Sequence, residues 1–491
     1  MRNKKSILLL LLLVVTMTIP AVGQERLHCS QDRHPKHVTM RSSRSSEHTM
    51  SRRMEYLGEK HQLLFLVDFS DLYFQDSDPA ALWKKVFNQK NFQEPPFHGS
   101  VRDYFYEQSF EQFELVFDVY YVHMDKNHAE YRSGDIDFYD DTRSGLLLTE
   151  ILDIKKEDIP DWSIYDWDDD GYINQVVILF AGKGQNDGGD ETTIWSHQWW
   201  LSSQSEAPYY REWGHPYPVS SGGKEFKVDK YGIFPELTRE GTYGTFGSFC
   251  HEYSHCLGLP DFYYGTNIDI VGRWDIMDLG NYNEGGFCPP CYSAHERMHL
   301  GWLDPIELTE TTTITDMESI SHGKKEAYLI RNDGYSNEYY IVENRQKTGW
   351  DSSLPGSGIV IFHIDYDEDI WKYGSPNTKD RTMYSIIPAN NLTSVLYSSG
   401  WAYPYQNNNM LTNESTPAAT LIHENTDGTL FMNKSLTDMK VTNGLASFQF
   451  KNNETGIWEQ KVLRQPKILY DYGPIYIIRN AQGEIKKVMK H

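Results

Sequence analysis

The segment at residues 251–261 constrains this chain more than any other, because it reads His-Glu-Tyr-Ser-His-Cys-Leu-Gly-Leu-Pro-Asp. His251 and His255 are four residues apart, so on an α-helix their imidazoles project from one face and can bind one Zn²⁺. Glu252 then lies beside the metal, where its carboxylate can accept a proton from zinc-bound water. The segment therefore predicts a zinc-binding helix with a general base next to the first ligand.

The next residues predict where this helix ends and where a third ligand comes from. Gly258 tolerates the left-handed conformation of a helix C-cap, and Pro260 forbids a continued helix. The chain then turns back and brings Asp261 within reach of the metal as an oxygen ligand. The alternative is a core helix that happens to carry two histidines. Both interpretations are compatible, because an apolar stripe at helical spacing lies on the opposite side.

A second metal signal lies between residues 166 and 174, which read Asp-Trp-Asp-Asp-Asp-Gly-Tyr-Ile-Asn. Alternating carboxylates, a glycine that permits a sharp turn and a final amide oxygen match the first half of a calcium loop. The glutamate that closes an EF-hand is absent, and Val177 stands in its place. We therefore predict a structural Ca²⁺ loop, against the alternative of a solvated acidic turn. Its ligands would be Asp166, Asp168, Asp170 and Asn174.

The N-terminal sequence is typical of an exported protein. Basic residues precede an apolar run, and small residues stand at 21–23, so residues 1–23 are predicted to be a signal peptide. Residues 24–58 are rich in basic residues and serine and are expected to be a pro-segment, with Arg52-Arg53 as a processing site. The product is therefore expected to be secreted or held at the cell surface.

Charge and hydropathy exclude two classes of partner. The formal net charge of −23 repels nucleic acid and anionic membranes, so no nucleic-acid partner is expected. Beyond the signal peptide, no segment is apolar enough to cross a bilayer, so no membrane insertion is expected.

The five cysteines are too few to carry the fold. Cys250 and Cys256 lie on the predicted zinc helix and point away from each other. Cys288-Pro-Pro-Cys291 could close a small local bridge, with a redox role as the alternative. Cys29, in the pro-segment, would be either a zinc ligand that keeps the enzyme latent or a free thiol.

The pattern along the chain predicts an α+β fold. We expect a zincin-like catalytic domain with an active-site helix at 59–304, an antiparallel β domain at 305–455, and a C-terminal hairpin at 456–491. In the first domain we expect strands at 63–69, 114–122 and 176–181, and helices at 79–88, 100–110 and 292–303. A compact turn at 272–280 would place Met277 beneath the metal ligands.

The chain resembles the immune inhibitor A-like metallopeptidases (peptidase family M six), in the secreted form found in gut Bacteroidetes. The resemblance rests on segments in order along the chain, at 65–71, 99–109, 166–172, 194–197, 251–261, 274–278 and 343–346.

The resemblance implies a zinc endopeptidase made as a zymogen. His251, His255 and Asp261 would bind zinc, and Glu252 would be the general base. Tyr282 would stabilise the oxyanion, and Met277 would form the Met-turn. His197 would either lie near the cleft or be structural. The final hairpin resembles the end of a type IX secretion sorting domain.

We therefore predict a secreted endopeptidase that hydrolyses proteins or peptides by zinc-bound water, with Glu252 as general base. The main alternative is a non-catalytic module that binds protein or glycan on a peptidase fold. A third interpretation is a metal-dependent hydrolase of non-peptide substrates.

Overall fold

The computed structural model describes most of the chain beyond residue 55. The described residues are 56–132, 143–185, 188–189, 191–202, 214–239, 241–243, 246–264, 270–322, 325–373 and 375–452, with the backbone of three strands between 467 and 489. The expected signal peptide and nearly all of the expected pro-segment, including Cys29, lie outside these residues. The body begins slightly earlier than expected, because the first strand already starts at Gly58.

Helices and strands are mixed along the described chain, which confirms an α+β class. The largest sheet in the first half has the strand order β2-β1-β4-β8-β5. The first four strands are parallel to their neighbours, and only β5 runs antiparallel to β8. The strands are β1 Gly58–Phe69, β2 Phe113–Met124, β4 Val176–Lys183, β8 Lys230–Leu237 and β5 His197–Trp200.

Both faces of this sheet are buried, because side chains alternate along each strand. On β1, Leu64 and Leu66 enter one core, whereas Leu63 and Phe65 enter another on the opposite face. The first core is covered by three helices, and the second by α4. The helices are α2 Pro79–Asn88, α3 Val101–Gln108, α5 Phe246–Cys256 and α4 Arg143–Lys155.

The strands of the second half are mainly antiparallel. One sheet has the order β14-β13-β12-β11-β9, in which only β9 and β11 are parallel, and another has the order β10-β16-β15. The strands are β9 Ile306–Glu307, β10 Thr312–Met317, β11 Tyr328–Arg331, β12 Glu338–Arg345, β13 Gly358–Asp365, β14 Tyr384–Ile386, β15 Lys434–Thr442 and β16 Leu445–Asn452.

The described chain also contains two further small sheets and a short helix. β3 (Tyr172–Ile173), β7 (Lys224–Val228) and β6 (Tyr217–Ser221) form one sheet. Near the C-terminus, β18 (Ile475–Arg479) pairs antiparallel with β19 (Ile485–Met489) and with β17 (Lys467–Tyr472). The short helix is α7, Glu368–Tyr373.

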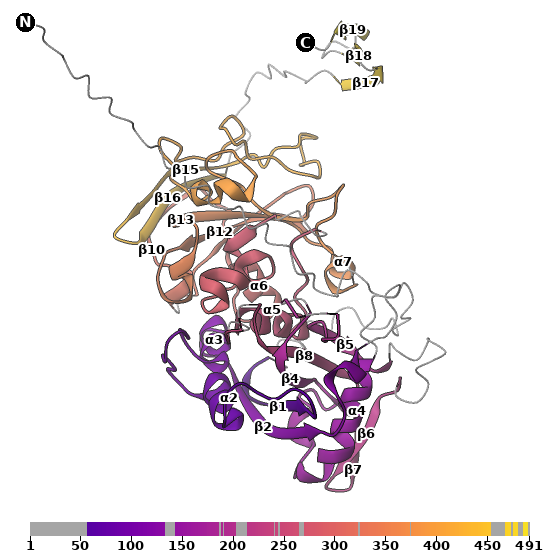
Figure 1. The fold of residues 1–491 in the computed structure, drawn as a ribbon. Helices are drawn as coiled ribbons and strands as arrows, with labels where there is room; N and C mark the ends of the chain where they lie inside the picture. Colours follow the sequence, from indigo (N-terminus) through magenta and orange to yellow (C-terminus); the bar gives the residue numbers. More distant parts are fainter. Residues whose placement is uncertain are drawn as a thin grey trace, which may run out of the picture.

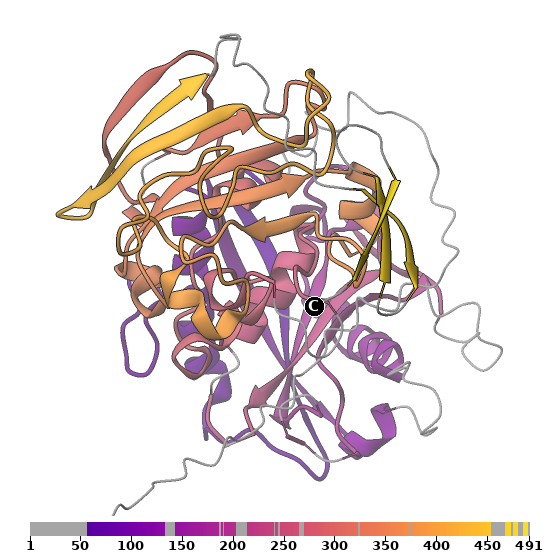
Figure 2. The same cartoon turned by 90° about the horizontal axis from the view of Figure 1, so that it is seen from above.

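One hydrophobic core joins the two halves of the molecule. It includes Leu64 of β1 and Phe249 of α5 together with Ile341 of β12 and Val360 of β13, so it crosses the boundary expected near residue 304. In Figure 1 the strands of the second half lie above the parallel sheet, with α5 and α6 (Ala294–His299) between them, and Figure 2 shows the same arrangement from above. Because α5 lies at the centre of this core, its position is fixed from both sides.

The helix expected at 292–303 is shorter than the sequence suggested. α6 spans only Ala294–His299. The side chain of Ser293 accepts a hydrogen bond from the backbone N–H of Glu296 and so caps the start. Gly301 has a φ of +77°, in the left-handed region, so the helix cannot continue through it. Within the residues that the structure describes, no helix is both long and apolar enough to span a bilayer.

Candidate metal centre and active site

The helix α5 ends where its sequence predicted. The backbone N–H of Gly258 donates to the carbonyl of His255 at 3.0 Å, and the N–H of Leu259 donates to that of Ser254 at 3.1 Å. Together with the φ of +98° at Gly258, these bonds form a Schellman motif. The motif reverses the chain one turn after His255 and so sends Asp261 back toward the helix.

The apolar face of α5 anchors the helix on the parallel sheet. The Phe249 ring packs on Phe234 of β8, with centroids 4.6 Å apart, and on Phe87 of α2 at 4.8 Å. The hydroxyl of Tyr253 donates to Oε1 of Gln62 on β1 at 2.8 Å. These contacts fix the rotation of α5, and the histidines therefore project from its other side.

His251, His255 and Asp261 converge on one buried point. Oδ1 of Asp261 lies 3.1 Å from Nε2 of His251 and 3.3 Å from Nε2 of His255, and all three side chains are almost fully buried. The Nδ1 atoms are occupied elsewhere: that of His251 bonds the carbonyl of Ile276 at 2.7 Å, and that of His255 bonds the carbonyl of Leu259 at 2.7 Å. A carbonyl only accepts, so each Nδ1 carries a proton, and the Nε2 atom of each ring is directed at Asp261.

This donor set fits a divalent cation. Both carboxylate oxygens of Asp261 are buried, and neither receives a hydrogen bond from the described residues. Two Nε2 atoms at 3.1 and 3.3 Å from a carboxylate oxygen would repel it if both rings were neutral, so either a cation or added protons must lie between them. Two imidazoles and one carboxylate, with each imidazole held through its other nitrogen, are the ligands and supporting bonds of a zinc site.

The electrostatics agree with this fit. Burial lowers the pKa of His251, but contact with the Asp261 carboxylate outweighs burial and raises that pKa to about 9. Burial alone would raise the pKa of Asp261, yet the two histidines hold it well below its usual range. The carboxylate therefore strongly favours positive charge at this point.

Glu252 is buried on the same helix, with 6 % of its surface exposed. It lies close enough to His251 that its negative charge also contributes to the raised pKa of that histidine. The structure thus places a carboxylate next to the cluster without making it part of the convergent set.

The turn at 272–280 supports two of the three convergent residues. The carbonyl of Ile276 holds His251, and the carbonyl of Met277 accepts a bond from the backbone N–H of Phe262 at 2.9 Å. The Met277 side chain is fully buried. The turn itself is held by Asp278, whose Oδ2 accepts three successive backbone N–H groups, those of Ile270, Val271 and Gly272. It therefore fixes the relative positions of the helix ligand and the loop ligand.

Tyr282 lies on the 3-10 helix η7, Leu279–Gly286. Its side chain is half-buried, and its carbonyl accepts a bond from the Arg273 guanidinium at 3.1 Å. η7 packs tightly on the start of α5, since a Cβ at Gly247 would lie 2.0 Å from the carbonyl oxygen of Asn281. Tyr282 thus lies on an element in contact with the candidate zinc helix, and its part in the reaction stays a prediction.

The structure also brings three carboxylates of the acidic loop together. The carboxylates of Asp166, Asp168 and Asp170 lie within 4.8 Å of one another. The Asp166 carboxylate accepts the backbone N–H groups of Asp170 and Gly171 at 3.1 and 3.0 Å, and Gly171 has a φ of +85°. Asn174, predicted as a further ligand, closes the loop: its side-chain oxygen accepts a hydrogen bond from the backbone N–H of Trp167 at 2.5 Å.

Two other candidates from the sequence are His197 and the pair Cys288 and Cys291. His197 is buried: its Nδ1 bonds the carbonyl of Trp195 at 2.7 Å, and its Nε2 lies 3.0 Å from the Ser144 hydroxyl. The bridge that the spacing of Cys288 and Cys291 allowed is not formed, and the four described cysteines are all free and buried.

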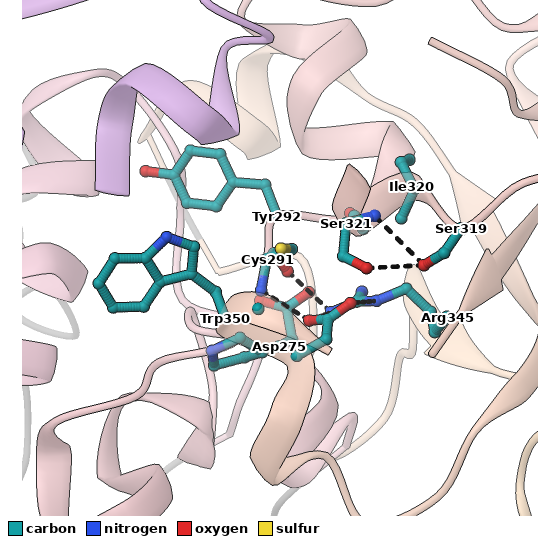
Figure 3. Close-up of polar contacts among 12 residues, drawn as sticks. Asp275, Cys291, Tyr292, Ser319, Ile320, Ser321, Arg345 and Trp350 are labelled. Carbon is teal, nitrogen blue, oxygen red and sulfur yellow. Dashed lines mark hydrogen bonds and ion pairs between the residues drawn. The ribbon is translucent and has the colours of Figure 1, made fainter. Parts of the chain in front are cut away.

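Sequence reasoning missed a buried ionic cluster around Arg345. The fully buried Arg345 guanidinium pairs with Asp351 through Nε at 2.7 Å, with Glu343 at 3.0 Å and with the carbonyl of Cys291 at 3.0 Å. Figure 3 shows Arg345 directed toward Cys291, with Asp275 nearby. The signal in the sequence was a pair of charged residues two apart, Glu343 and Arg345, at the end of a strand whose centre is apolar.

The helix, the convergent side chains and the turn that supports them define a candidate mononuclear metal centre. Comparison with known proteins places the chain in a family. The model described as "Immune inhibitor A peptidase M6, catalytic domain" matches residues 53–299. The chain therefore belongs to the immune inhibitor A peptidase M6 family, which confirms the resemblance drawn from the sequence.

Two curated relatives are similar to parts of the chain. Immune inhibitor A of Bacillus thuringiensis subsp. alesti is 31 % identical over 144 residues, which cover 26 % of this chain and 18 % of the relative. Pre-pro-metalloprotease PrtV of Vibrio cholerae serotype O1 is 25 % identical over 280 residues, which cover 48 % of this chain and 29 % of the relative. The matches thus span less than a third of either relative.

Proposed function

We propose that this chain is an exported zinc endopeptidase that hydrolyses peptide bonds in proteins. The observation that carries the proposal is the convergence of His251, His255 and Asp261, with Nε2 atoms directed at one point and Glu252 beside it. Family membership and the metalloprotease relative support it. The zincin-like character of the domain is part of the same proposal.

The chemistry follows from the positions of these side chains. Zinc, when bound by the three ligands, would lower the pKa of a water molecule and polarise the scissile carbonyl. Glu252 would take the proton from the attacking water and pass it to the leaving amine. The hydroxyl of Tyr282 would donate a hydrogen bond to the oxyanion that develops on the substrate.

The edge strand β5 favours a polypeptide substrate over a small molecule. Among the described strands, β5 pairs only with β8, and it lies against α5. An extended peptide can add to such an edge through main-chain hydrogen bonds. This argues against the alternative of a non-peptide hydrolase, and the buried Glu252 argues against a non-catalytic binding module.

The first test is hydrolysis of casein by the purified protein with 1,10-phenanthroline or with its non-chelating 1,7 isomer. We expect the 1,10 isomer to abolish cleavage, added Zn²⁺ to restore it, and the 1,7 isomer to have little effect. Tight zinc binding without cleavage of any protein substrate would favour the binding-module alternative.

We further propose that the acidic loop binds Ca²⁺ through Asp166, Asp168 and Asp170, with Asn174 holding the loop closed. Two backbone N–H groups already orient the Asp166 carboxylate, and burial raises its pKa, so a bound cation would stabilise the charged form. We expect removal of Ca²⁺ with EGTA to lower Tm, and Asp168→Asn to remove most of this effect. An EGTA-insensitive Tm would leave the loop a solvated acidic turn.

Export as a zymogen is proposed on the sequence pattern at residues 1–58. The relative from Vibrio cholerae is named a pre-pro-metalloprotease, which supports the same organisation here. N-terminal sequencing of the protein recovered from the medium should begin beyond Arg53. The proposed boundary at 455 and the sorting role of the final hairpin can be tested by truncation at 455. This should block export if the hairpin is a signal.

A further inference from the structure

A second convergent set of metal-binding side chains lies away from the candidate active site. Donor atoms of His98, Glu284 and Cys288 all lie within 4.8 Å of one another. His98 Nε2 and Glu284 Oε2 are 2.6 Å apart, with 39 % and 45 % of their side chains exposed, whereas Cys288 is fully buried. The set is thus open to solvent on one side and closed on the other.

The three residues come from segments that other contacts already hold together. His98 precedes α3, and the neighbouring Phe97 packs edge-on against Phe287, with ring centroids 5.3 Å apart. The next residue, Gly99, lies so close to Trp350 that a Cβ there would be 2.6 Å from its ring. The donors therefore do not need a metal to be brought near one another, and the site is preorganised.

The backbone at Glu284 has an uncommon conformation. Glu284 has a φ of +49°, in the left-handed region that glutamate seldom adopts. The turn is closed by the backbone N–H of Cys288, which donates to the carbonyl of Asn283 at 3.3 Å. Glu284 and Cys288 are four residues apart in sequence, and this short turn brings their donor atoms into the same cluster.

The Cys288 sulfur has a neighbouring hydroxyl that can donate to it once the thiol proton is lost. The thiol donates to the carbonyl of Trp350 at 3.4 Å, and its sulfur lies 3.3 Å from the Ser352 hydroxyl. Burial raises the pKa of Cys288, and hydrogen bonds from Ser352 and Ser353 oppose this shift. A metal would replace the thiol proton, and the Ser352 hydroxyl would then donate to the bound sulfur.

We propose that His98, Glu284 and Cys288 form a second, structural zinc site. One imidazole, one carboxylate and one thiolate are ligand types that Zn²⁺ accepts, whereas Ca²⁺ and Mg²⁺ require oxygen. The two anionic ligands balance the charge of the ion, and solvent at the exposed side completes the coordination. Because Glu284 belongs to η7, the site would fasten η7, which packs on α5, to the loop before α3.

Thiolate ligation gives this site a signature that the histidine-aspartate site lacks. The full chain carrying Cys29→Ser, which removes the one cysteine outside the described residues, is loaded with Co²⁺ alone. We expect a sulfur-to-cobalt charge-transfer band. The band should disappear in Cys288→Ser and persist in His251→Ala, in which the proposed catalytic site is broken. This separates failure of the second site from failure of the first.

Zinc counting provides the second measurement. With Zn²⁺ alone, Cys288→Ser and His98→Ala should each retain one zinc ion fewer per chain than the parent protein, and a Cys291→Ser control should lose none. His98→Ala keeps the proposal falsifiable if the buried Cys288→Ser variant fails to fold. Absence of the charge-transfer band in the parent, or an unchanged zinc content in His98→Ala, would show that His98 and Glu284 are only an ion pair beside a free thiol.

Discussion

Replacing Glu252 by Gln should reduce casein hydrolysis by about 100- to 10,000-fold, the contribution typical of a positioned general base. The amide has nearly the same shape as the carboxylate but cannot accept the proton of the attacking water. Zinc content should not change, because Glu252 is not among the convergent residues. The loss should therefore appear in kcat, measured with the zinc-loaded protein.

The comparison needs a matched control and a check of the fold. Glu414→Gln makes the same chemical change at an exposed site in the second half and should keep full activity. Far-ultraviolet circular dichroism and zinc analysis should agree for all three proteins. A zinc-loaded Glu252→Gln enzyme with wild-type turnover would show that another group is the base.

Replacing Asp261 by Ala should weaken zinc affinity by more than about 100-fold. Changes in residues that only support the ligands already lower metal affinity by roughly 10- to 100-fold. Asp261 supplies the carboxylate to which both Nε2 atoms are directed, at 3.1 and 3.3 Å. Its loss would leave two imidazoles and no anionic ligand, so hydrolysis should be lost as well. Competition with a chromophoric chelator measures the affinity directly.

This measurement is best made in the Cys288→Ser background, so that a second bound ion does not hide the change. Asp369→Ala removes an exposed carboxylate from α7 and serves as the control. If Asp261→Ala binds zinc as tightly as its parent, Asp261 is not a ligand, and the third ligand must come from another residue.

The local features of the candidate centre were predictable from sequence because they depend on residues close in the chain. The spacing of His251 and His255 determines that they share a helical face. Gly258 determines the end of α5, since its left-handed φ permits the Schellman bonds. The short apolar run at 63–69 likewise predicted a buried strand, and both faces of that strand are buried in the structure.

Features that depend on contacts between distant segments were not predictable. One miss was local instead: the helix at 292–303 was predicted too long because helical periodicity was followed past Ser293, which caps the start, and Gly301, which ends the turn. The bridge between Cys288 and Cys291 was allowed by spacing alone. In the structure, the Cys288 sulfur instead lies beside Trp350 and Ser352, on a segment about 60 residues away.

The sequence by itself therefore determined the chemistry available to this protein: two imidazoles and a base on one helix, a nearby carboxylate, and an acidic loop. Only the tertiary structure decided which nitrogen of each imidazole faces Asp261, because the carbonyls that hold Nδ1 belong to Ile276 and Leu259. It also decided that His98 meets Glu284 and Cys288, which are more than 180 residues further along the chain. Periodicity reports which face of an element is buried, whereas convergence of donors requires packing that places separate elements together.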